Sequence, residues 1–204
     1  LRASATFEPP TRREPSALVR AIRRTCRGWN GRASGYALFR GRAIARLTSR
    51  LGLDAGEAYV LSWLLVAAVL LLFGAVAGPA PAVGYAAAAL VGYRWLDIFL
   101  FETEFLLKME HSTLRSIPRG TVLRALNLLE ILVGTAAIVM LLSDSSLGAA
   151  LAKGFETVTL QPQLHSPGWV VDLLGVAGAV TTLLLLSGGL AMLIGKVAET
   201  FDEG

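Results

Sequence analysis

The sequence predicts an all-α membrane protein with four transmembrane helices, a re-entrant pore helix and N-terminal amphipathic interfacial helices. Two properties carry this prediction. Of the 204 residues, 54% are hydrophobic and 17% are charged, a composition outside the range of ordinary soluble domains. Four apolar runs also reach the roughly 20 residues that a helix needs to cross a bilayer. These runs are Tyr59–Ala77, Ala82–Phe101, Val122–Leu142 and Trp169–Gly195.

Residues 1–56 are expected to form a basic arm on the cytoplasmic side. Two stretches of the arm, Ser16–Trp29 and Tyr36–Leu53, place apolar residues among frequent arginines. Such a pattern is typical of amphipathic helices on an anionic leaflet, where each basic residue contributes about 1 kcal/mol of binding free energy. The arm is interpreted either as a topology-fixing segment bound to anionic lipid headgroups or as a regulatory arm that docks a partner.

Residues 57–108 contain the first two spans, and Gly78-Pro79-Ala80-Pro81 separates them so tightly that an antiparallel hairpin is predicted. Basic residues predict the orientation, because arginine and lysine near span ends stay on the cytoplasmic side. Nine arginines lie between Arg20 and Arg50, and four more basic residues lie between Lys108 and Arg124. Both segments and both termini are therefore predicted to be cytoplasmic, in a multi-pass protein of the plasma (inner) membrane.

Three charged residues are predicted to lie inside the second and third spans. Arg94 and Asp97 are one helical turn apart, and Glu130 is in the inner half of the third span. A lone charge at that depth costs about 2.5–3.5 kcal/mol, so the three side chains should find partners. We expect an Arg94–Asp97–Glu130 cluster between the hairpin and the third span. Its role is either a static packing clamp or a gating or voltage-coupled contact.

Two more carboxylates, Glu102 and Glu104, follow at the inner end of the second span. They are predicted either to reach toward Lys108 or Arg115 or to form a solvated face. Either arrangement would keep their charges at the membrane interface.

Residues 109–204 are predicted to form a pore-like module. The stretch Leu147–Val158 has the pattern of an amphipathic helix but is too short to cross a bilayer. A polar turn around Pro162 separates it from the final span. A helix that enters the membrane and leaves by the same side is typical of pore loops, because irregular backbone at membrane depth needs protein or water around it.

Several segments of this module resemble two-transmembrane potassium-channel modules. Phe155-Glu156-Thr157-Val158-Thr159-Leu160 resembles the end of their pore helix, and Leu173–Val197 is similar to their inner helix, with Gly188 and Gly189 as its glycine hinge. The resemblance to bacterial four-span members of the superfamily continues through Arg94–Ile98 and Asn127–Ile131. It covers about residues 93–197 and implies a homotetramer around a central pore.

The chain departs from this family at the selectivity filter. The family sequence is Thr-Val-Gly-Tyr-Gly, whose glycines let successive carbonyls point at a desolvated ion. Here both glycine positions are lost, and Pro162 removes a backbone donor. We therefore predict a homotetrameric channel that passes monovalent cations with low or altered selectivity. The alternative is a non-conducting scaffold or interaction subunit that retains the fold. The expected pore and filter residues are Thr157, Thr159, Leu160, Gln161, Pro162 and Gln163.

Other chemistry finds little support in the sequence. His111, His165 and Cys26 are too few and too scattered for zinc, which needs three or four convergent ligands. No histidine lies in a span to serve as the base for Ser187 as a nucleophile. We therefore expect no catalytic residue, metal, cofactor or nucleic-acid partner.

Overall fold

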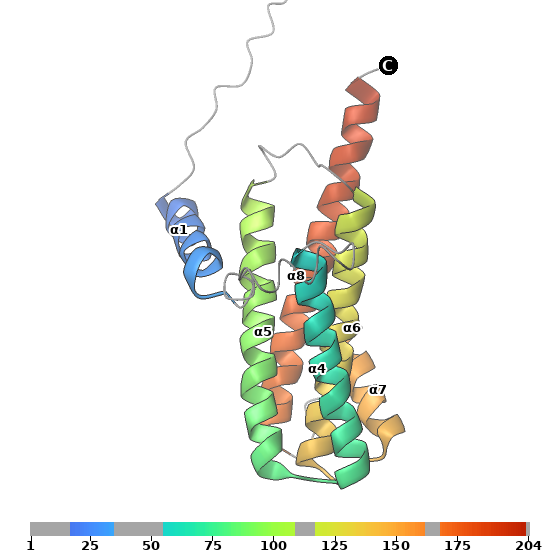
Figure 1. Cartoon of the computed structure of the whole chain (residues 1–204). Coiled ribbons are helices and arrows are strands. Elements are labelled where there is room, and N and C mark those ends of the chain that lie inside the picture. Colours follow the sequence, from blue (N-terminus) through green and yellow to red (C-terminus); the bar gives the residue numbers. More distant parts are fainter. Residues whose placement is uncertain (1–16, 35–54, 109–116, 162–167, 203–204) are drawn as a thin grey trace, which may run out of the picture.

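The computed structural model describes residues 17–34, 55–108, 117–161 and 168–202. Within these ranges the regular structure is entirely helical (Figure 1). The helices are α1 (Ala17–Arg32), α4 (Ala55–Ala77), α5 (Pro81–Lys108), α6 (Ile117–Leu142), α7 (Leu147–Val158) and α8 (Trp169–Asp202).

The four predicted membrane crossings are confirmed as helices long and apolar enough to span a bilayer. They are Gly56–Ala77 in α4, Pro81–Leu107 in α5, Arg119–Leu142 in α6 and Trp169–Gly195 in α8. Large apolar side chains such as Leu65, Leu72 and Leu190 point outward. Exposing such apolar faces to water is unfavourable, whereas the hydrocarbon chains of lipid can cover them without this cost. The chain is a multi-pass membrane protein.

Helix α6 forms the centre of the bundle. It packs against α4, α5, α7 and α8, and it is the most buried of the four spans. Ile131, Ala136, Ala137 and Leu141 are completely buried within it. Small alanines allow neighbouring backbones to approach closely, which is how helices associate where lipid removes the hydrophobic driving force.

The turn between α4 and α5 is as tight as predicted, although the two helices do not pack along each other. They run in opposite directions from a turn in which Gly78 has a positive φ of 74° (Figure 1). Helix α4 packs along α6 instead, while α5 packs against α6 and α8. Gly74 brings α4 against Met140, and the Ala80 N–H donates to the Leu141 carbonyl over 2.9 Å. The hairpin is therefore opened around the end of α6.

Helix α7 occupies the predicted range Leu147–Val158 and packs against α6 and α8. Ser146 caps its first turn by accepting a hydrogen bond from the Ala149 N–H. At its end, the Gln161 N–H donates to the Glu156 carbonyl over 2.9 Å. Leu160 closes this turn with a φ of 61°, a left-handed conformation that is unfavourable for a residue other than glycine.

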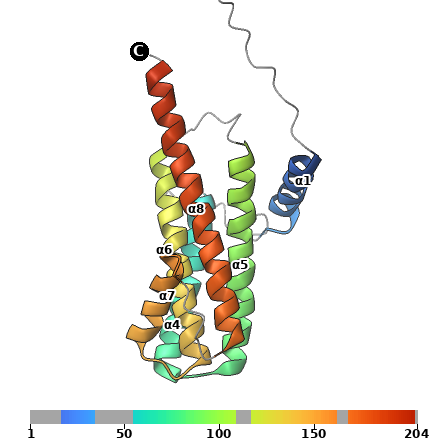
Figure 2. The ribbon, with the colours of Figure 1, turned by 180° about the vertical axis from the view of Figure 1, so that it is seen from behind.

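The N-terminal arm contributes one described helix. The first predicted stretch, Ser16–Trp29, corresponds to α1, which packs against α5 near the end of the bundle from which the C-terminal end of α8 emerges (Figure 2). The second predicted stretch, Tyr36–Leu53, lies outside the described residues.

Contact between α7 and α6 depends on Gly154, because a Cβ atom there would overlap the carbonyl oxygen of Leu132. We expect Gly154→Ala to lower the free energy of unfolding by about 1–3 kcal/mol, as overpacking does. Thermal unfolding of the purified protein in detergent micelles measures this loss.

Gly148 provides the matched control, since a Cβ atom there would meet nothing within 4 Å. Gly148→Ala should leave the melting temperature unchanged or raise it, because alanine favours helix by up to about 1 kcal/mol. If the two variants melted together, α7 would not be seated on α6 as described.

Candidate functional site

Arg94, in α5, is the centre of a buried polar cluster. Its Nε donates to Glu130 Oε1 of α6 over 3.0 Å, and its Nη2 donates to Glu130 Oε2 over 3.2 Å. Nη2 also donates to Asn127 Oδ1 over 3.0 Å. The two charged side chains are only 5% and 4% exposed. Two-point pairs between a guanidinium and a carboxylate are shorter and stronger than hydrogen bonds between neutral groups.

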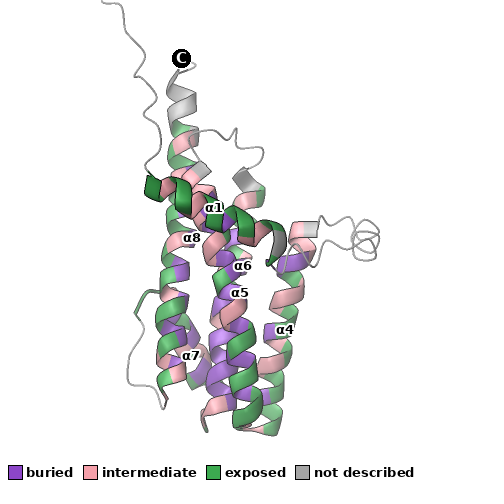
Figure 3. Cartoon of the chain, turned by 90° about the vertical axis from the view of Figure 1, so that its left-hand side faces the viewer, coloured by how far each residue is buried: buried purple, intermediate pink, exposed green. Residues whose placement is uncertain are grey.

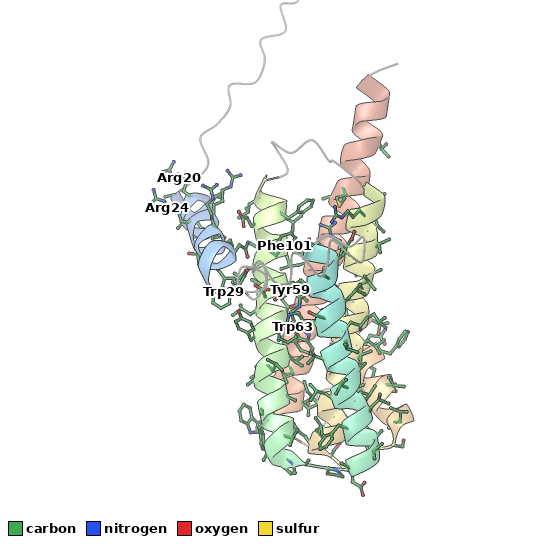
Figure 4. All side chains as sticks on the ribbon, in the orientation of Figure 1. Arg20, Arg24, Trp29, Tyr59, Trp63 and Phe101 are labelled. Carbon is green, nitrogen blue, oxygen red and sulfur yellow. The ribbon has the colours of Figure 1, made fainter. Side chains whose placement is uncertain are left out.

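Asp97 completes the cluster, one turn after Arg94. Its Oδ2 lies 3.6 Å from Arg94 Nη1 and accepts a 2.7 Å hydrogen bond from the Tyr59 hydroxyl of α4. Its Oδ1 accepts a 3.1 Å hydrogen bond from the Trp29 indole N–H of α1. Figure 4 shows Trp29 and Tyr59 approaching α5 at a similar level, from α1 and from α4. Side chains of four helices, α1, α4, α5 and α6, therefore meet here.

The charges in the cluster do not balance. One guanidinium faces two carboxylates, so the ionised cluster would carry one excess negative charge inside the spans. Two neutral donors, Trp29 and Tyr59, are both directed at Asp97, and the Tyr59 ring lies 4.7 Å from the Arg94 guanidinium carbon. Hydrogen bonds to a carboxylate stabilise its charged form, and a guanidinium over a ring adds a cation–π interaction. Asp97 thus receives hydrogen bonds from α1 and from α4.

A second buried pair joins α5 to α6, nearer the C-terminal end of α5 and the N-terminal end of α6. Glu102 Oε2 accepts from Arg124 Nη2 over 2.8 Å and from Arg124 Nε over 3.2 Å. The partner of Glu102 is thus Arg124, which an antiparallel neighbour supplies at the same depth, while the predicted partners Lys108 and Arg115 have side chains outside the described residues. Glu104 accepts a hydrogen bond from the Asn30 amide of α1. Both carboxylates are buried, so the alternative of a solvated face is wrong.

The predicted hinge glycines lie beside this second pair. A Cβ atom at Gly188 would come within 2.6 Å of Glu102 Oε2 and 3.1 Å of Arg124 Nη2. At Gly189 the nearest atom, Arg124 Cδ, would be 3.9 Å away. Helix α8 runs without a break through both positions. Gly188 therefore lets α8 approach the ion pair, and its role as a hinge stays a prediction.

The predicted pore residues fall into three groups. Thr157 is buried, its hydroxyl donates to the Lys153 carbonyl over 3.0 Å, and its methyl group lies against Gly178 of α8. In the single chain the predicted residues Thr159, Leu160 and Gln161 are exposed. The remaining two, Pro162 and Gln163, lie outside the described residues.

Four partners of the buried charges escaped sequence reasoning: Trp29, Asn30, Tyr59 and Arg124. Arg124 lies inside the third apolar run, which was a signal that it needed a carboxylate at its own depth. The excess negative charge of the triad was a signal that further donors were required. Nothing in the sequence indicated that they would come from α1 and from the first turns of α4.

Removing Arg94 should be far more damaging than removing an exposed charge. Arg94→Gln leaves two buried carboxylates without a cation, and we expect a loss of about 3–5 kcal/mol in the free energy of unfolding. Adding Glu130→Gln to Arg94→Gln should recover part of that loss, because one of the two carboxylates is then gone. Thermal unfolding in micelles, followed by tryptophan fluorescence, measures each step.

Glu57 is the control, since its pair with Arg119 at 3.2 Å is partly exposed. Glu57→Gln should change stability by at most about 1 kcal/mol. An Arg94→Gln variant as stable as Glu57→Gln would show that the buried cluster does not hold the helices together.

The cluster acts electrostatically, because its paired charges fix the positions of the helices relative to one another. In the part of the chain that the structure describes, no three His, Cys, Asp or Glu side chains converge to hold a metal ion. No protein-family model, curated protein or solved structure matches this chain.

Proposed function

We propose that this chain is one subunit of a channel-like membrane protein. Four copies would surround a pore that passes monovalent cations with low or altered selectivity. In this proposal α6 is the outer helix, α7 is a re-entrant pore helix and α8 is the inner helix. The observation that carries the proposal is the depth at which α7 packs against its neighbours.

Two contacts give that depth. Gly154 meets the backbone of Leu132, which lies 10 residues before the end of α6 at Leu142. Thr157 meets Gly178, which lies 9 residues after the start of α8 at Trp169. At 1.5 Å per residue, both contacts are about 14–15 Å from the helix ends, or half of a hydrocarbon core about 30 Å thick. This supports a helix that enters the bilayer and ends near its middle.

The end of α7 supports an assembly of several copies. Thr159, Leu160 and Gln161 follow the helix at that depth, yet they are exposed in the single chain. Non-helical backbone at membrane depth needs protein or water beside it, because lipid offers no hydrogen bonds. Neighbouring copies around a water-filled axis would supply both. The C-terminal end of α7, the negative end of its dipole, would then favour a cation there.

The distribution of basic residues supports the proposed orientation. Helix α1, the basic ends of α5 and α6, and the C-terminal end of α8 all lie at one end of the bundle (Figure 1). The α4–α5 turn and the α6–α7 connection lie at the other end. Because basic residues remain in the cytoplasm, we infer that the first end is cytoplasmic, with the chain in the plasma membrane.

A non-conducting scaffold is the second candidate, and the turn after α7 favours it. Leu160, an apolar residue, occupies the left-handed position, and the Thr157 hydroxyl is bonded to the Lys153 carbonyl within its own helix. Neither group is arranged to replace the water shell of an ion. Such a chain would keep the channel-like fold only to assemble or to hold a partner.

Ion flux from liposomes that contain the purified full chain separates the two candidates. The channel predicts potassium and sodium flux at similar rates, with little chloride flux. Gln161→Arg should then lower cation flux at least tenfold, because it adds a positive charge at the proposed constriction.

Val76→Arg is the matched control, since Val76 is 88% exposed near the end of α4, a helix to which the proposal gives no part in the pore. It adds the same charge and should leave flux unchanged. Absence of all flux from assembled oligomers would favour the scaffold, and a solitary protomer by native mass spectrometry would exclude the shared pore.

A further inference from the structure

Helix α1 supplies polar groups to an acidic face of α5. Its side chains reach two carboxylates and one carbonyl of α5, and the Tyr93 hydroxyl of α5 donates back to the Ala33 carbonyl over 2.6 Å. The rings of Trp29 and Tyr93 also lie 5.8 Å apart. The bonds from α1 run from Trp29 to Asp97, from Asn30 to Glu104 and from Arg23 to the Leu107 carbonyl. Docked α1 therefore completes the hydrogen bonding of groups in a membrane-spanning helix.

The opposite face of α1 is basic. Arg20, Arg24 and Arg27 are spaced by four and three residues, so they share one side of the helix, and all three are exposed. Arg20 and Arg24 point away from the bundle in Figure 4, and the outer face of α1 is exposed in Figure 3. The sequence of α1 contains five arginines and no acidic residue.

The start of α1 matches the level of lipid headgroups. Arg23 contacts the Leu107 carbonyl, where the apolar span of α5 ends, whereas the far end of α1 reaches Tyr93, about four turns deeper along α5. Leu18, 69% exposed, adds an apolar side chain near the start of the helix. Guanidinium groups bind phosphate oxygens in two-point geometry, and the cytoplasmic leaflet carries anionic lipid. Charge and position together therefore select an anionic headgroup as the occupant.

We propose that anionic phospholipid headgroups bind the Arg20–Arg24–Arg27 stripe and hold α1 docked, so that lipid composition determines how firmly Trp29 is bonded to Asp97. Helix α1 is then a latch with one face on the membrane surface and the other on the intramembrane cluster. The proposal goes beyond the proposed channel and needs no ion conduction. Its test and the flux test can fail independently.

Cys26 is a native reporter of the latch. It is the single cysteine of the chain and is 1% exposed between α1 and α5. Burial, and then the nearby charge of Glu104, raise the pKa of the Cys26 thiol above its usual value. Because the thiolate is the reactive form, the docked thiol should react slowly with an alkylating reagent. Undocking of α1 would expose the thiol and speed the reaction.

The experiment measures the rate at which an uncharged maleimide alkylates Cys26 in the full chain. The protein is placed in nanodiscs of phosphatidylcholine alone or with one quarter phosphatidylglycerol. We expect alkylation at least threefold slower with phosphatidylglycerol. The triple variant Arg20→Gln, Arg24→Gln and Arg27→Gln should lose this difference. In the unmodified chain, 1 M salt should reduce it, because the screening length falls to about 3 Å.

A matched control removes the effect of the lipid on surface pH and on local reagent concentration. Thr25 is exposed beside Cys26, so Thr25→Cys in a Cys26→Ser background reports those effects without docking. The quantity compared is the ratio of the Cys26 rate to this control rate in the same lipid. Trp29→Phe, which removes the bond to Asp97, should raise the Cys26 rate in both lipids and shows that the assay detects undocking.

Three results would overturn the proposal. The first is a ratio that differs less than twofold between the lipids while Trp29→Phe still raises the rate. The second is a lipid effect that survives both the triple variant and 1 M salt. The third is protection of Cys26 by added soluble polyglutamate but not by phosphatidylglycerol, which would make an acidic protein segment the occupant.

Discussion

A guanidinium removed from water must be matched by acceptors on all sides, and Arg94 imposes this requirement on the fold. Glu130 and Asn127 hold it from α6, and Asp97 lies beside it on α5. Asp97 in turn draws in Tyr59 of α4 and Trp29 of α1. Helices that share only apolar surfaces can slide or rotate in lipid at little cost, whereas helices tied to one buried charge cannot. The cluster therefore sets the relative depth of four helices.

The architecture could be predicted where one physical rule decides the outcome. Bilayer thickness decides which apolar runs become spans, and the short helix Leu147–Val158 follows from its amphipathic pattern. Packing partners could not be predicted in the same way. The tight turn at Gly78 indicated that α4 and α5 would lie together, but α4 packs along α6, where Gly74 meets Met140. Which helix another helix packs against depends on small steric matches between their surfaces, and apolar composition does not reveal these matches.

The charged residues of the site were predictable in part. Arg94, Asp97 and Glu130 lie deep in apolar runs, and that depth alone requires them to find one another. Glu102 was assigned basic partners close in sequence, while its actual partner, Arg124, comes from an antiparallel helix. Trp29 was missed because it belongs to a segment expected to lie on lipid. Contacts between elements distant in the chain need a three-dimensional arrangement, and periodicity describes only one element at a time.

Helix α8 continues from its span as one unbroken cylinder to Asp202, and its last turns project past the other helices (Figure 1). Gly188 seats the same helix directly on the Glu102–Arg124 ion pair. A rotation applied to one end of a continuous helix is transmitted along its length. Gly188 has no side chain that could adjust to this movement. Twisting the projecting tip would consequently strain the contact between α5 and α6, about twenty ångströms away along the rod.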